Sequence, residues 1–400
     1  MKKQVLMIAY TNYRLDPRIR REAETLAATS EYAVRFLAPK QQHRKKTFQF
    51  DGVTVEELNI SKYFGGRKVG YLISYLHFFV LAFLNCTKKF LQREIEIIHV
   101  HNMPNFLVFA GVIPRWFGKK LILDIHDTVP EHYAGKFETP ASKLLHGIFC
   151  LEERISCALA HRIICVNHVQ RDVLVNRGIP GEKITISMNV PDHMKFHHQK
   201  MTREANGEDF KMVYHGTLEK RLGIDLVIRV MAELADEIPG LQFHILGVGS
   251  HAYLEELLQL RGDLHLEERV FCNFNPVPVD QVPEFLMKMD LGVVPNRKNI
   301  ATELMLPVKM LEYISLGIPV VASRLKTIEY YFAEDMVSYF EPENVSSMAD
   351  AILKLYKDQI KRERQAIHAT TFLEKYGWEK HQLDLMKLYD HLCSPQKEMA

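Results

Sequence analysis

Cysteine is scarce in this sequence, and its spacing excludes two kinds of structure. The 400 residues include six cysteines, with no CxxC pair and no paired spacing that suits zinc: Cys86, Cys150, Cys157, Cys165, Cys272 and Cys393. Isolated cysteines of this kind are typical of reduced thiols in a cytosolic protein. We therefore expect no disulfide framework and no metal site, and we expect a cytoplasmic location.

Apolar runs long enough to cross a membrane are also missing. The first residues, "MKKQVLMIAY", begin with lysines as a signal peptide does, but their apolar run is only about seven residues long and ends in the polar "TNYRLDPR". We interpret this segment as the first strand.

The apolar run at residues 71–84, "YLISYLHFFVLAFL", is too short to span a bilayer. Arg67 and Lys68 precede it, and Lys88 and Lys89 follow it. Two interpretations stay open: a buried helix of the first domain, or a helix that faces a membrane and is anchored by its flanking cations.

The chain as a whole has almost no excess of either charge, with 51 lysines and arginines against 49 aspartates and glutamates. The two halves differ, however. Residues 1–200 contain 29 basic and 18 acidic side chains, whereas residues 201–400 contain 22 and 31. A basic half can attract nucleic acid, anionic lipid or a phosphate-bearing substrate. The sequence has no RNA-binding signature, which counts against nucleic acid as a partner.

Strand-like apolar runs alternate with helical patterns along the chain. The expected strands are residues 4–10, 32–38, 95–101, 120–126, 162–167 and 184–189, followed by 210–216, 241–249, 269–274, 290–295 and 319–323. Such alternation predicts parallel sheets covered by helices on both faces. Because the pattern occurs twice, we expect an α/β protein of two Rossmann-like, doubly wound domains.

The polar segment at residues 197–209, "HHQKMTREANGED", separates the two patterns, and we place a hinge there. The expected domains are residues 1–200 and 201–375, with a C-terminal helix at 376–400 that packs back toward the first domain. Ligands of open parallel sheets bind at the carboxyl ends of the strands. The expected site is therefore the cleft between the two domains.

The segment "ELMLPVKMLEYISLGIPVVAS", residues 303–323, predicts a helix that leads into a buried strand. Pro307 suits the first turn of a helix, and Gly317 ends it. The free N–H groups at such a helix start favour an anion, most often phosphate. Lys309 in the first turn would face that anion, and Glu312 one turn later suits a ribose diol. The alternative is a solvated ion pair between Lys309 and Glu312.

Several motifs resemble one family of enzymes. The segments "YHGTLEKRLGIDLVIRV" (214–230), "ILGVGS" (245–250) and "LPVKMLEYISLGIPVVAS" (306–323) are similar, in this order and spacing, to the donor-binding half of family 4 retaining glycosyltransferases with the GT-B fold. The first half is similar in "DPRIRREAETLA", "IIHVHNMPN" and "LILDIHDTVPEHY", and the end in "YGWEKHQLDLMKLYDHL". The resemblance therefore covers essentially the whole chain.

The resemblance implies a nucleotide-sugar donor, a UDP- or GDP-sugar, whose pyrophosphate becomes more negative as the sugar leaves. Arg221 matches the family's basic position for this pyrophosphate, with Lys220 as the adjacent alternative. Both follow a strand that ends at Gly216. The backbone N–H groups near residues 306–309 would complete the phosphate site, which comprises Leu306, Pro307, Val308 and Lys309.

The family also carries two glutamates at a fixed spacing, one at the donor sugar and one at the ribose. Glu312 matches the second. The first would fall on Leu304, so we assign its role to the neighbouring Glu303, which a one-residue change in the loop before Pro307 would accommodate. The alternative for Glu303 is a surface charge on a loop.

Histidines provide the candidates in the first domain. His126 in "DIHD" matches the family's histidine at the transferred sugar, where it could donate a hydrogen bond or assist proton movement. Asp127 is a secondary candidate, and His101 is a further one on the acceptor side. His193, His197 and His198 could suggest a metal, but they fit a solvated linker better, and this fold generally needs no metal.

The first loop, "TNYRLDPRIRR", lacks the two glycines that many family members have after the first strand. Asp16 and Arg18 occupy the equivalent region, and we take them as candidates for acceptor binding.

These patterns together predict a retaining glycosyltransferase without a cofactor or metal. It would use a glycan or lipid-linked acceptor in surface polysaccharide or glycolipid synthesis, with peripheral contact to an anionic membrane. The alternatives are a nucleotide-sugar-binding protein without turnover and a GT-B-fold epimerase.

Overall fold

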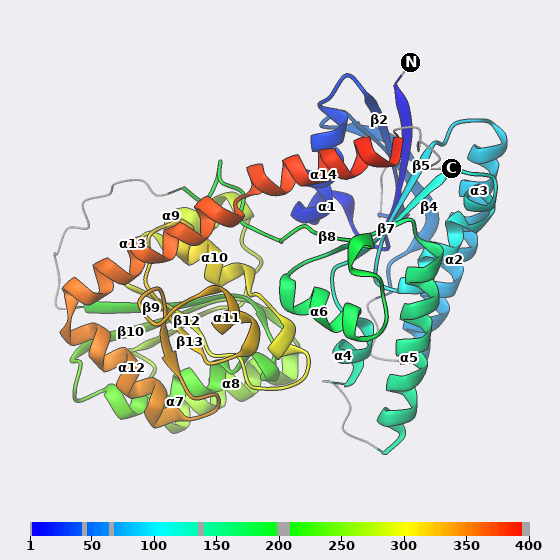
Figure 1. The fold of residues 1–400 in the computed structure, drawn as a ribbon. Helices are drawn as coiled ribbons and strands as arrows, with labels where there is room; N and C mark the ends of the chain where they lie inside the picture. The colour runs from blue at the N-terminus through cyan, green and yellow to red at the C-terminus, as the bar shows by residue number, and fades with distance from the viewer. Residues whose placement is uncertain (1, 42–45, 64–67, 135–139, 198–208, 394–400) are drawn as a thin grey trace. The chain divides into compact units, whose positions relative to one another are not determined.

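The structure is a computed structural model that describes residues 2–41, 46–63, 68–134, 140–197 and 209–393. The chain forms two compact units, drawn in Figure 1. Unit 1 comprises Met1–Asn189 and Glu379–Ala400, and unit 2 comprises Val190–Trp378. This division falls earlier in the chain than the expected hinge at residues 197–209, most of which lies outside the described residues.

Among its described residues, unit 1 has an eight-stranded sheet with the order β3-β4-β2-β1-β5-β6-β7-β8. The strands are β1 (Lys3–Ile8), β2 (Tyr32–Lys40), β3 (Thr47–Phe50), β4 (Val53–Ser61), β5 (Ile97–His101), β6 (Lys120–Ile125), β7 (Arg162–Cys165) and β8 (Ile184–Ile186). The helices are α1 (Pro17–Ala27), α2 (Lys68–Leu91), α3 (Val112–Trp116), α4 (Val129–Ala134), α5 (Pro140–Leu159), α6 (His168–Asn176) and α14 (Trp378–Cys393), with short 3-10 turns η1 (Tyr13–Leu15), η2 (Asn105–Gly111) and η3 (Gly181–Lys183).

The described part of unit 2 has a six-stranded sheet with the order β11-β10-β9-β12-β13-β14. Its strands are β9 (Asp209–Leu218), β10 (Gly240–Gly249), β11 (Val270–Asn273), β12 (Leu291–Val294), β13 (Val320–Ser323) and β14 (Ser338–Phe340). Its helices are α7 (Ile224–Leu234), α8 (His251–Asp263), α9 (Val282–Leu286), α10 (Val308–Ser315), α11 (Lys326–Tyr331), α12 (Val345–Lys357) and α13 (Gln359–Tyr376), with η4 (Lys220–Leu222), η5 (Val279–Gln281) and η6 (Thr302–Leu304).

The two sheets confirm the α/β prediction, with one correction. The pairs are parallel except that β3 runs antiparallel to β4 at the edge of the first sheet. Strands β3, β4 and β14 were not expected. The hairpin of β3 and β4 extends the sheet beyond β2 and gives unit 1 a mixed edge.

The central strands of unit 1 are apolar along their length because both faces of the sheet are covered there. In β1, Leu6 and Ile8 are part of one core cluster, while Val5 and Met7 are part of the cluster on the other face. The second cluster also includes Leu385, Leu388, Tyr389 and Leu392 of α14. The last helix of the chain is therefore a core element of unit 1.

Helix α2 contains the apolar run at residues 71–84 and is longer than that run. The expectation that no apolar segment is long enough to cross a membrane was wrong, because the helical segment Val69–Leu91 is long and apolar enough by length and composition. Phe78, Ala82 and Cys86 on one face are fully buried in the core of unit 1. Lys89 is also buried, with its Nζ 2.9 Å from Glu56 Oε1, so it is not the exposed flanking cation that the sequence suggested. Arg67 lies outside the described residues. The opposite face of α2 is exposed and apolar.

Candidate functional site

The carboxyl end of β9 and the start of α10 carry the candidate site of unit 2. The Tyr313 hydroxyl, fully buried on α10, accepts a hydrogen bond from the backbone N–H of His215 (3.2 Å) and lies 2.9 Å from its Nδ1. His215 Nε2 lies 2.5 Å from Glu312 Oε2. The other oxygen of Glu312 has no hydrogen-bond partner among the described residues. The carboxylate is thus held in place on one side and available to a ligand on the other.

Lys309 lies next to this pair and is also held by β9. Its Nζ donates a hydrogen bond to the Tyr214 hydroxyl (2.5 Å) and lies 3.7 Å from the centre of the Tyr214 ring. Burial lowers the pKa of Lys309 to about 7, and Arg221 adds to this effect, whereas Glu312 opposes it. Gly216 lies beside Lys309 with a positive φ of 103°, which favours glycine, and a Cβ there would be in ordinary contact with Lys309 Nζ at 3.6 Å. A lysine with this pKa gains a proton readily when an anion binds.

The start of α10 provides unsatisfied donors. Pro307 is the N-cap residue of α10, and its side chain provides no hydrogen bond to the helix. The helix begins at Val308, so Pro307 lies directly before the first turn, and not within it as expected from the sequence. The first N–H groups of a helix have no partner within it. Leu306 precedes the cap and is partly buried. The backbone from 306 to 309 therefore has the donors and the helix dipole that an anion needs.

Arg221 lies on η4 directly after β9. Its Nε donates to Glu219 Oε2 (2.6 Å), and its Nη1 lies 3.4 Å from Met305 Sδ, in the segment before α10. The neighbouring Lys220 pairs instead with Glu256 (2.8 Å) and is largely exposed. Arg221 is near enough to lower the pKa of Lys309, and Glu312 is near enough to raise it, whereas Lys220 is held by Glu256.

The loop that holds Arg221 is braced by an ion pair. Both Nη atoms of Arg297 donate to the Asp225 carboxylate, at 2.9 and 2.7 Å, and the Arg297 backbone N–H donates to the Arg221 carbonyl (2.9 Å). Gly223 ends η4 with a φ of 72°, and a Cβ there would collide with the Pro295 carbonyl oxygen at 2.0 Å. Only glycine fits this turn without a shift of the backbone.

Glu303 lies on η6, and its carboxylate is engaged within unit 2. Its Oε2 accepts a hydrogen bond from the Lys326 backbone N–H (3.0 Å) at the start of α11, and its Oε1 lies 3.6 Å from Lys298 Nζ. Its carbonyl accepts from the Thr327 hydroxyl (2.7 Å). Glu303 thus joins η6 to α11, and its role at the donor sugar stays a prediction.

The histidine candidates of unit 1 meet at a buried aspartate. Asp124 of β6 has its Oδ2 3.0 Å from His101 Nδ1 and 3.0 Å from His126 Nε2. His126 is partly exposed at the end of β6, and its backbone N–H donates to Asn102 Oδ1 (2.8 Å). His101 is fully buried. Asp127 is exposed beside His126. His126 is therefore the member of this group that can reach a ligand.

The other acceptor-side candidates have structural partners. Arg18 is buried, with Nη2 2.5 Å from Asp124 Oδ1 and Nε 3.5 Å from Glu22 Oε1. Asp16 is the N-cap of α1 and accepts from the Ile19 backbone N–H (3.3 Å). Arg18 thus serves the interior of unit 1 in this structure, and acceptor binding by Asp16 or Arg18 stays a prediction.

The buried charges shift one another's pKa values. Burial alone would raise the pKa of Asp124, but Arg18, together with hydrogen bonds from His101 and His126, holds it well below its usual range. Burial, with the Asp124 charge, raises the pKa of Glu22 to about 7. Burial and the neighbouring His101 lower the pKa of His99 well below 6.5. Asp124 therefore stays ionised beside His126.

Four of these side chains could be considered as metal ligands. Glu22, His99, His101 and Asp124 offer ligand atoms that all lie within 4.8 Å of one another. The rings of His99 and His101, however, are stacked with centroids 4.3 Å apart and planes 24° apart. Stacked imidazoles cannot both direct an in-plane lone pair at one ion, and Arg18 already neutralises Asp124. We assign this cluster no metal role.

Several residues of the two sites were not singled out from the sequence. Asp124 is a charged residue within the apolar run "LILDI", and this signal could have indicated a buried polar network. Glu22 lies in the charged segment "PRIRREAETLA" and has no such signal. Tyr214 and His215 lie within the quoted "YHGT", but nothing in the sequence shows that they touch α10. The pairing of Arg297 with Asp225 joins positions far apart in the chain and has no sequence signal.

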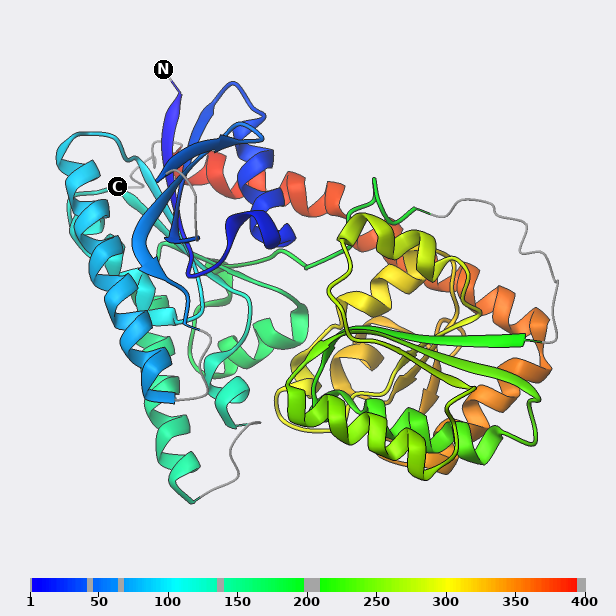
Figure 2. The ribbon, with the colours of Figure 1, turned by 180° about the vertical axis from the view of Figure 1, so that it is seen from behind.

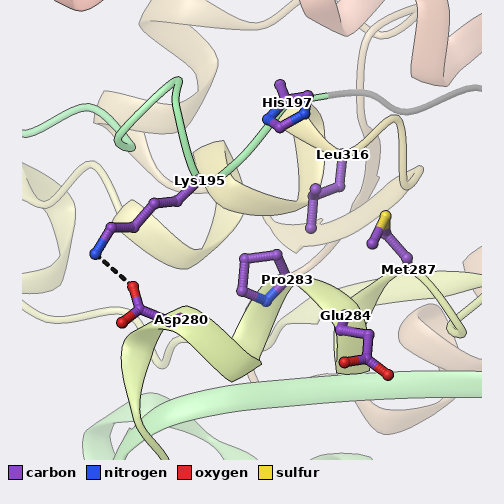
Figure 3. Close-up of a pocket in the computed structure, with 7 residues that line it drawn as sticks. All are labelled: Lys195, His197, Asp280, Pro283, Glu284, Met287 and Leu316. Atoms are coloured by element: carbon purple, nitrogen blue, oxygen red, sulfur yellow. Dashed lines mark ion pairs between the residues drawn. The ribbon is translucent and has the colours of Figure 1, made fainter.

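A cavity of about 250 Å³ lies elsewhere in unit 2, beside the segment that follows β8 and includes Lys195 and His197 (Figure 3). It is lined by Lys195, His197, Asp280, Pro283, Glu284, Met287 and Leu316, and Lys195 pairs with Asp280 at 2.6 Å. It includes none of the predicted donor residues. His197 lies at this cavity and His193 precedes it, whereas His198 lies outside the described residues.

Comparison with known sequences and structures identifies both halves. Residues 17–190 match the model of the family described as Glycosyltransferase Family 4, and residues 209–358 match that of Glycosyl transferases group 1. No curated protein sequence matches the chain.

Among solved structures, sucrose-phosphate synthase from Thermosynechococcus elongatus is similar with a TM-score of 0.77 and 15% identity over 98% of this chain and 99% of that one. Anabaena HepE in complex with UDP-glucose gives 0.69 and 16% over 97% and 99%. The trehalose 6-phosphate synthase of Burkholderia multivorans gives 0.68 and 11% over 98% and 100%. These likenesses show the fold.

The two family matches together span most of the chain, and the protein belongs to the glycosyltransferases, with a family 4 domain followed by a group 1 domain on the GT-B fold.

Proposed function

We propose that the protein is a retaining glycosyltransferase that moves a sugar from a UDP- or GDP-sugar to a glycan or lipid-linked acceptor, in the synthesis of a surface polysaccharide or glycolipid. The observation that carries the proposal is the convergence in unit 2 of Arg221, Lys309, the uncapped start of α10 and the half-engaged carboxylate of Glu312. Together these groups suit a nucleoside diphosphate, with cations for phosphate and a carboxylate for ribose.

The chemistry follows from charge. As the sugar leaves, negative charge grows on the pyrophosphate, and Arg221 with the α10 N–H groups would stabilise it more in the transition state than in the ground state. Lys309, with a pKa near 7, would be protonated by the approach of the phosphates. His126 in unit 1, held beside the ionised Asp124, stays our prediction for the group at the transferred sugar. The proposal needs no metal or cofactor.

Calorimetry of UDP, GDP and their sugars would test the donor site directly. At pH 8 we expect one nucleoside diphosphate to bind with uptake of close to one proton, measured from the dependence of the binding heat on the buffer's ionisation heat. The Lys309→Met variant should lose this uptake. If no nucleoside diphosphate binds, the donor assignment is wrong.

Retention is tested separately by the anomeric configuration of the product with a simple alcohol acceptor. An inverted product would contradict this part of the proposal alone.

A second candidate is a nucleotide-sugar-binding protein without turnover. It is favoured by the engagement of both Glu303 oxygens within unit 2 and by Leu304 at the family's first glutamate position. Slow hydrolysis of the donor in the absence of acceptor distinguishes the two, because a binding protein releases the sugar nucleotide intact.

The proposed location is the cytoplasm, at the inner face of a membrane. A lipid-linked acceptor would bring the enzyme to such a surface, and the basic first half of the chain favours anionic lipid.

A further inference from the structure

Helix α2 has two faces of different character. One face is fixed to the sheet by buried Phe78, Ala82 and Cys86 and by a hydrogen bond between the Ser74 and Tyr10 hydroxyls (2.5 Å). The other face is exposed and carries apolar side chains at helical spacing: Val69, Leu72, Ile73, Leu76, Val80, Leu84 and Leu91. Within the described residues, Val69–Leu91 is one segment apolar enough to cross a membrane, and 17% of its most apolar window is buried.

Helix α5 repeats this arrangement. Its exposed face carries Leu144, Leu145, Ile148, Leu151 and Ile155, again at helical spacing. Both helices pack on η2, and Figures 1 and 2 show them side by side along one side of unit 1. We call the two exposed faces, together with Trp116 and Phe117, the apolar surface of unit 1.

Trp116 and Phe117 join this surface at the end of α2. They are 74% and 70% exposed, and the Phe117 ring lies 5.6 Å from that of Phe90 on α2. Soluble proteins seldom expose so many large apolar side chains in one place, and such a surface marks a site of interaction. A tryptophan at its edge is typical of the membrane interface.

The charges around the apolar surface identify the partner. Segment 69–91 contains no aspartate or glutamate, and the carboxylates of 144–159 are used internally: Glu153 pairs with Arg177 (2.6 Å), and Glu152 accepts from Asn105 (3.1 Å). The exposed charged side chains in these two segments are Lys88 and Arg154. In a symmetric dimer the same surface of a second copy would bring further cations, and these segments would provide no free carboxylate to pair them. Anionic lipid headgroups satisfy them.

We propose that the apolar surface of unit 1 docks on an anionic phospholipid bilayer, with α2 and α5 lying in the plane of the interface. The helices do not span the bilayer, because the buried face of α2 is part of the core. The inference deepens the proposed membrane location, on which it rests, by naming the surface that meets the lipid, but it does not depend on sugar transfer.

Flotation with lipid vesicles tests the docking. We expect the protein to float with phosphatidylcholine vesicles that contain roughly a third phosphatidylglycerol, and to float less as salt rises, because headgroup attraction is screened. Two triple variants address the two helices: Leu76→Gln, Val80→Gln, Leu84→Gln on α2, and Ile148→Gln, Leu151→Gln, Ile155→Gln on α5. Each should lower the partition coefficient roughly tenfold or more.

Matched controls test whether flotation depends on this surface, and not on exposed apolar side chains in general or on misfolding. Ile360→Gln with Ile367→Gln changes exposed apolar residues on α13 of unit 2 and should leave flotation unchanged. Lys88→Gln with Arg154→Gln should weaken binding to the anionic vesicles about fivefold for each cation removed. Because all these side chains are exposed, circular dichroism and thermal unfolding should match those of the wild type.

Tryptophan fluorescence gives a second readout, since the chain has two tryptophans. With Trp378→Phe, the emission of Trp116 should shift to the blue on vesicle binding. No flotation at any salt, no shift of Trp116, or an equal loss in the α13 control would overturn the proposal. So would a wild-type dimer that the α2 variant dissociates, because the surface would then be an interface between two copies.

Discussion

Lys309 is the most informative residue to change, because its charge is unfavourable in the free protein. Its pKa of about 7 lies below the ordinary 10.5 since burial disfavours the ammonium ion. The difference between these two pKa values corresponds to a loss of at most about 5 kcal/mol in the free energy of unfolding. Lys309 keeps a hydrogen bond and ring contact with Tyr214 and is partly exposed, so we expect roughly half of this. Lys309→Met keeps the length of the side chain and removes the charge.

The sign of the effect depends on pH. Between pH 7 and 10.5 the unfolded chain binds more protons at this position than the folded one, so the stability of the wild type rises with pH over that window. Below pH 7 both states are protonated and the penalty is fully present. We expect Lys309→Met to be more stable than the wild type by about 2 kcal/mol at pH 6.5 and by only about 1 kcal/mol at pH 9.5.

Urea unfolding at the two pH values measures this difference. A Trp116→Phe background leaves Trp378, which belongs to unit 2, as the fluorescent reporter. Lys357→Met removes an exposed lysine of the same unit and should change the free energy of unfolding by less than about 0.5 kcal/mol at either pH. The reasoning fails if Lys309→Met is less stable at pH 6.5, or if its effect is the same at both pH values.

Three further predictions concern the two sites. Arg221→Ala should lower kcat/KM on the order of a hundredfold with little change in thermal stability, because its partner is a charge that grows in the transition state; an unchanged kcat/KM would move the role to Lys220. Glu312→Ala should raise the Kd for the donor and spare kcat at saturation, since a ribose contact is made equally in both states, and a large fall in kcat would contradict this. Asp124→Asn should lower the free energy of unfolding, measured in urea, by about 3 kcal/mol because it leaves Arg18 buried and unpaired. Adding Arg18→Met should recover part of this loss. A double variant no more stable than the single one would show that Asp124 does not stabilise the protein through its pairing with Arg18.

The central strands were predictable because both their faces are buried, which makes them continuous apolar runs. Strand β4 was missed because Glu56 and Glu57 interrupt its alternating pattern. The strand lies between β2 and the edge strand β3, and Glu56 pairs there with the buried Lys89 of α2. Strand β14 is only three residues long and has no room for a pattern.

The local backbone at Gly216, Pro307 and Glu312, where we expect the donor to bind, was predictable because a motif fixes it. Their partners were not, because contacts such as His215 with Glu312 depend on how α10 packs on β9. The same is true of Arg18, which was expected at an acceptor but lies against Asp124 on a distant strand. A sequence shows which side chains carry charge, but packing decides which of them reach solvent.

The position of α14 has a consequence for the order in which the protein folds during synthesis. Unit 2 is inserted between two segments of unit 1, whose core includes Leu385, Leu388, Tyr389 and Leu392 from the end of the chain. The ribosome releases these residues after those of unit 2, so unit 1 cannot complete its core while unit 2 is being made, whereas unit 2 has all of its own chain before then. The usual N-terminal-first order of domain folding is thereby reversed at the final step. A fragment that ends at Asn189 would keep α1 on this face of the sheet but would expose the apolar side chains that α14 covers, and we expect it to bind chaperones rather than to fold stably.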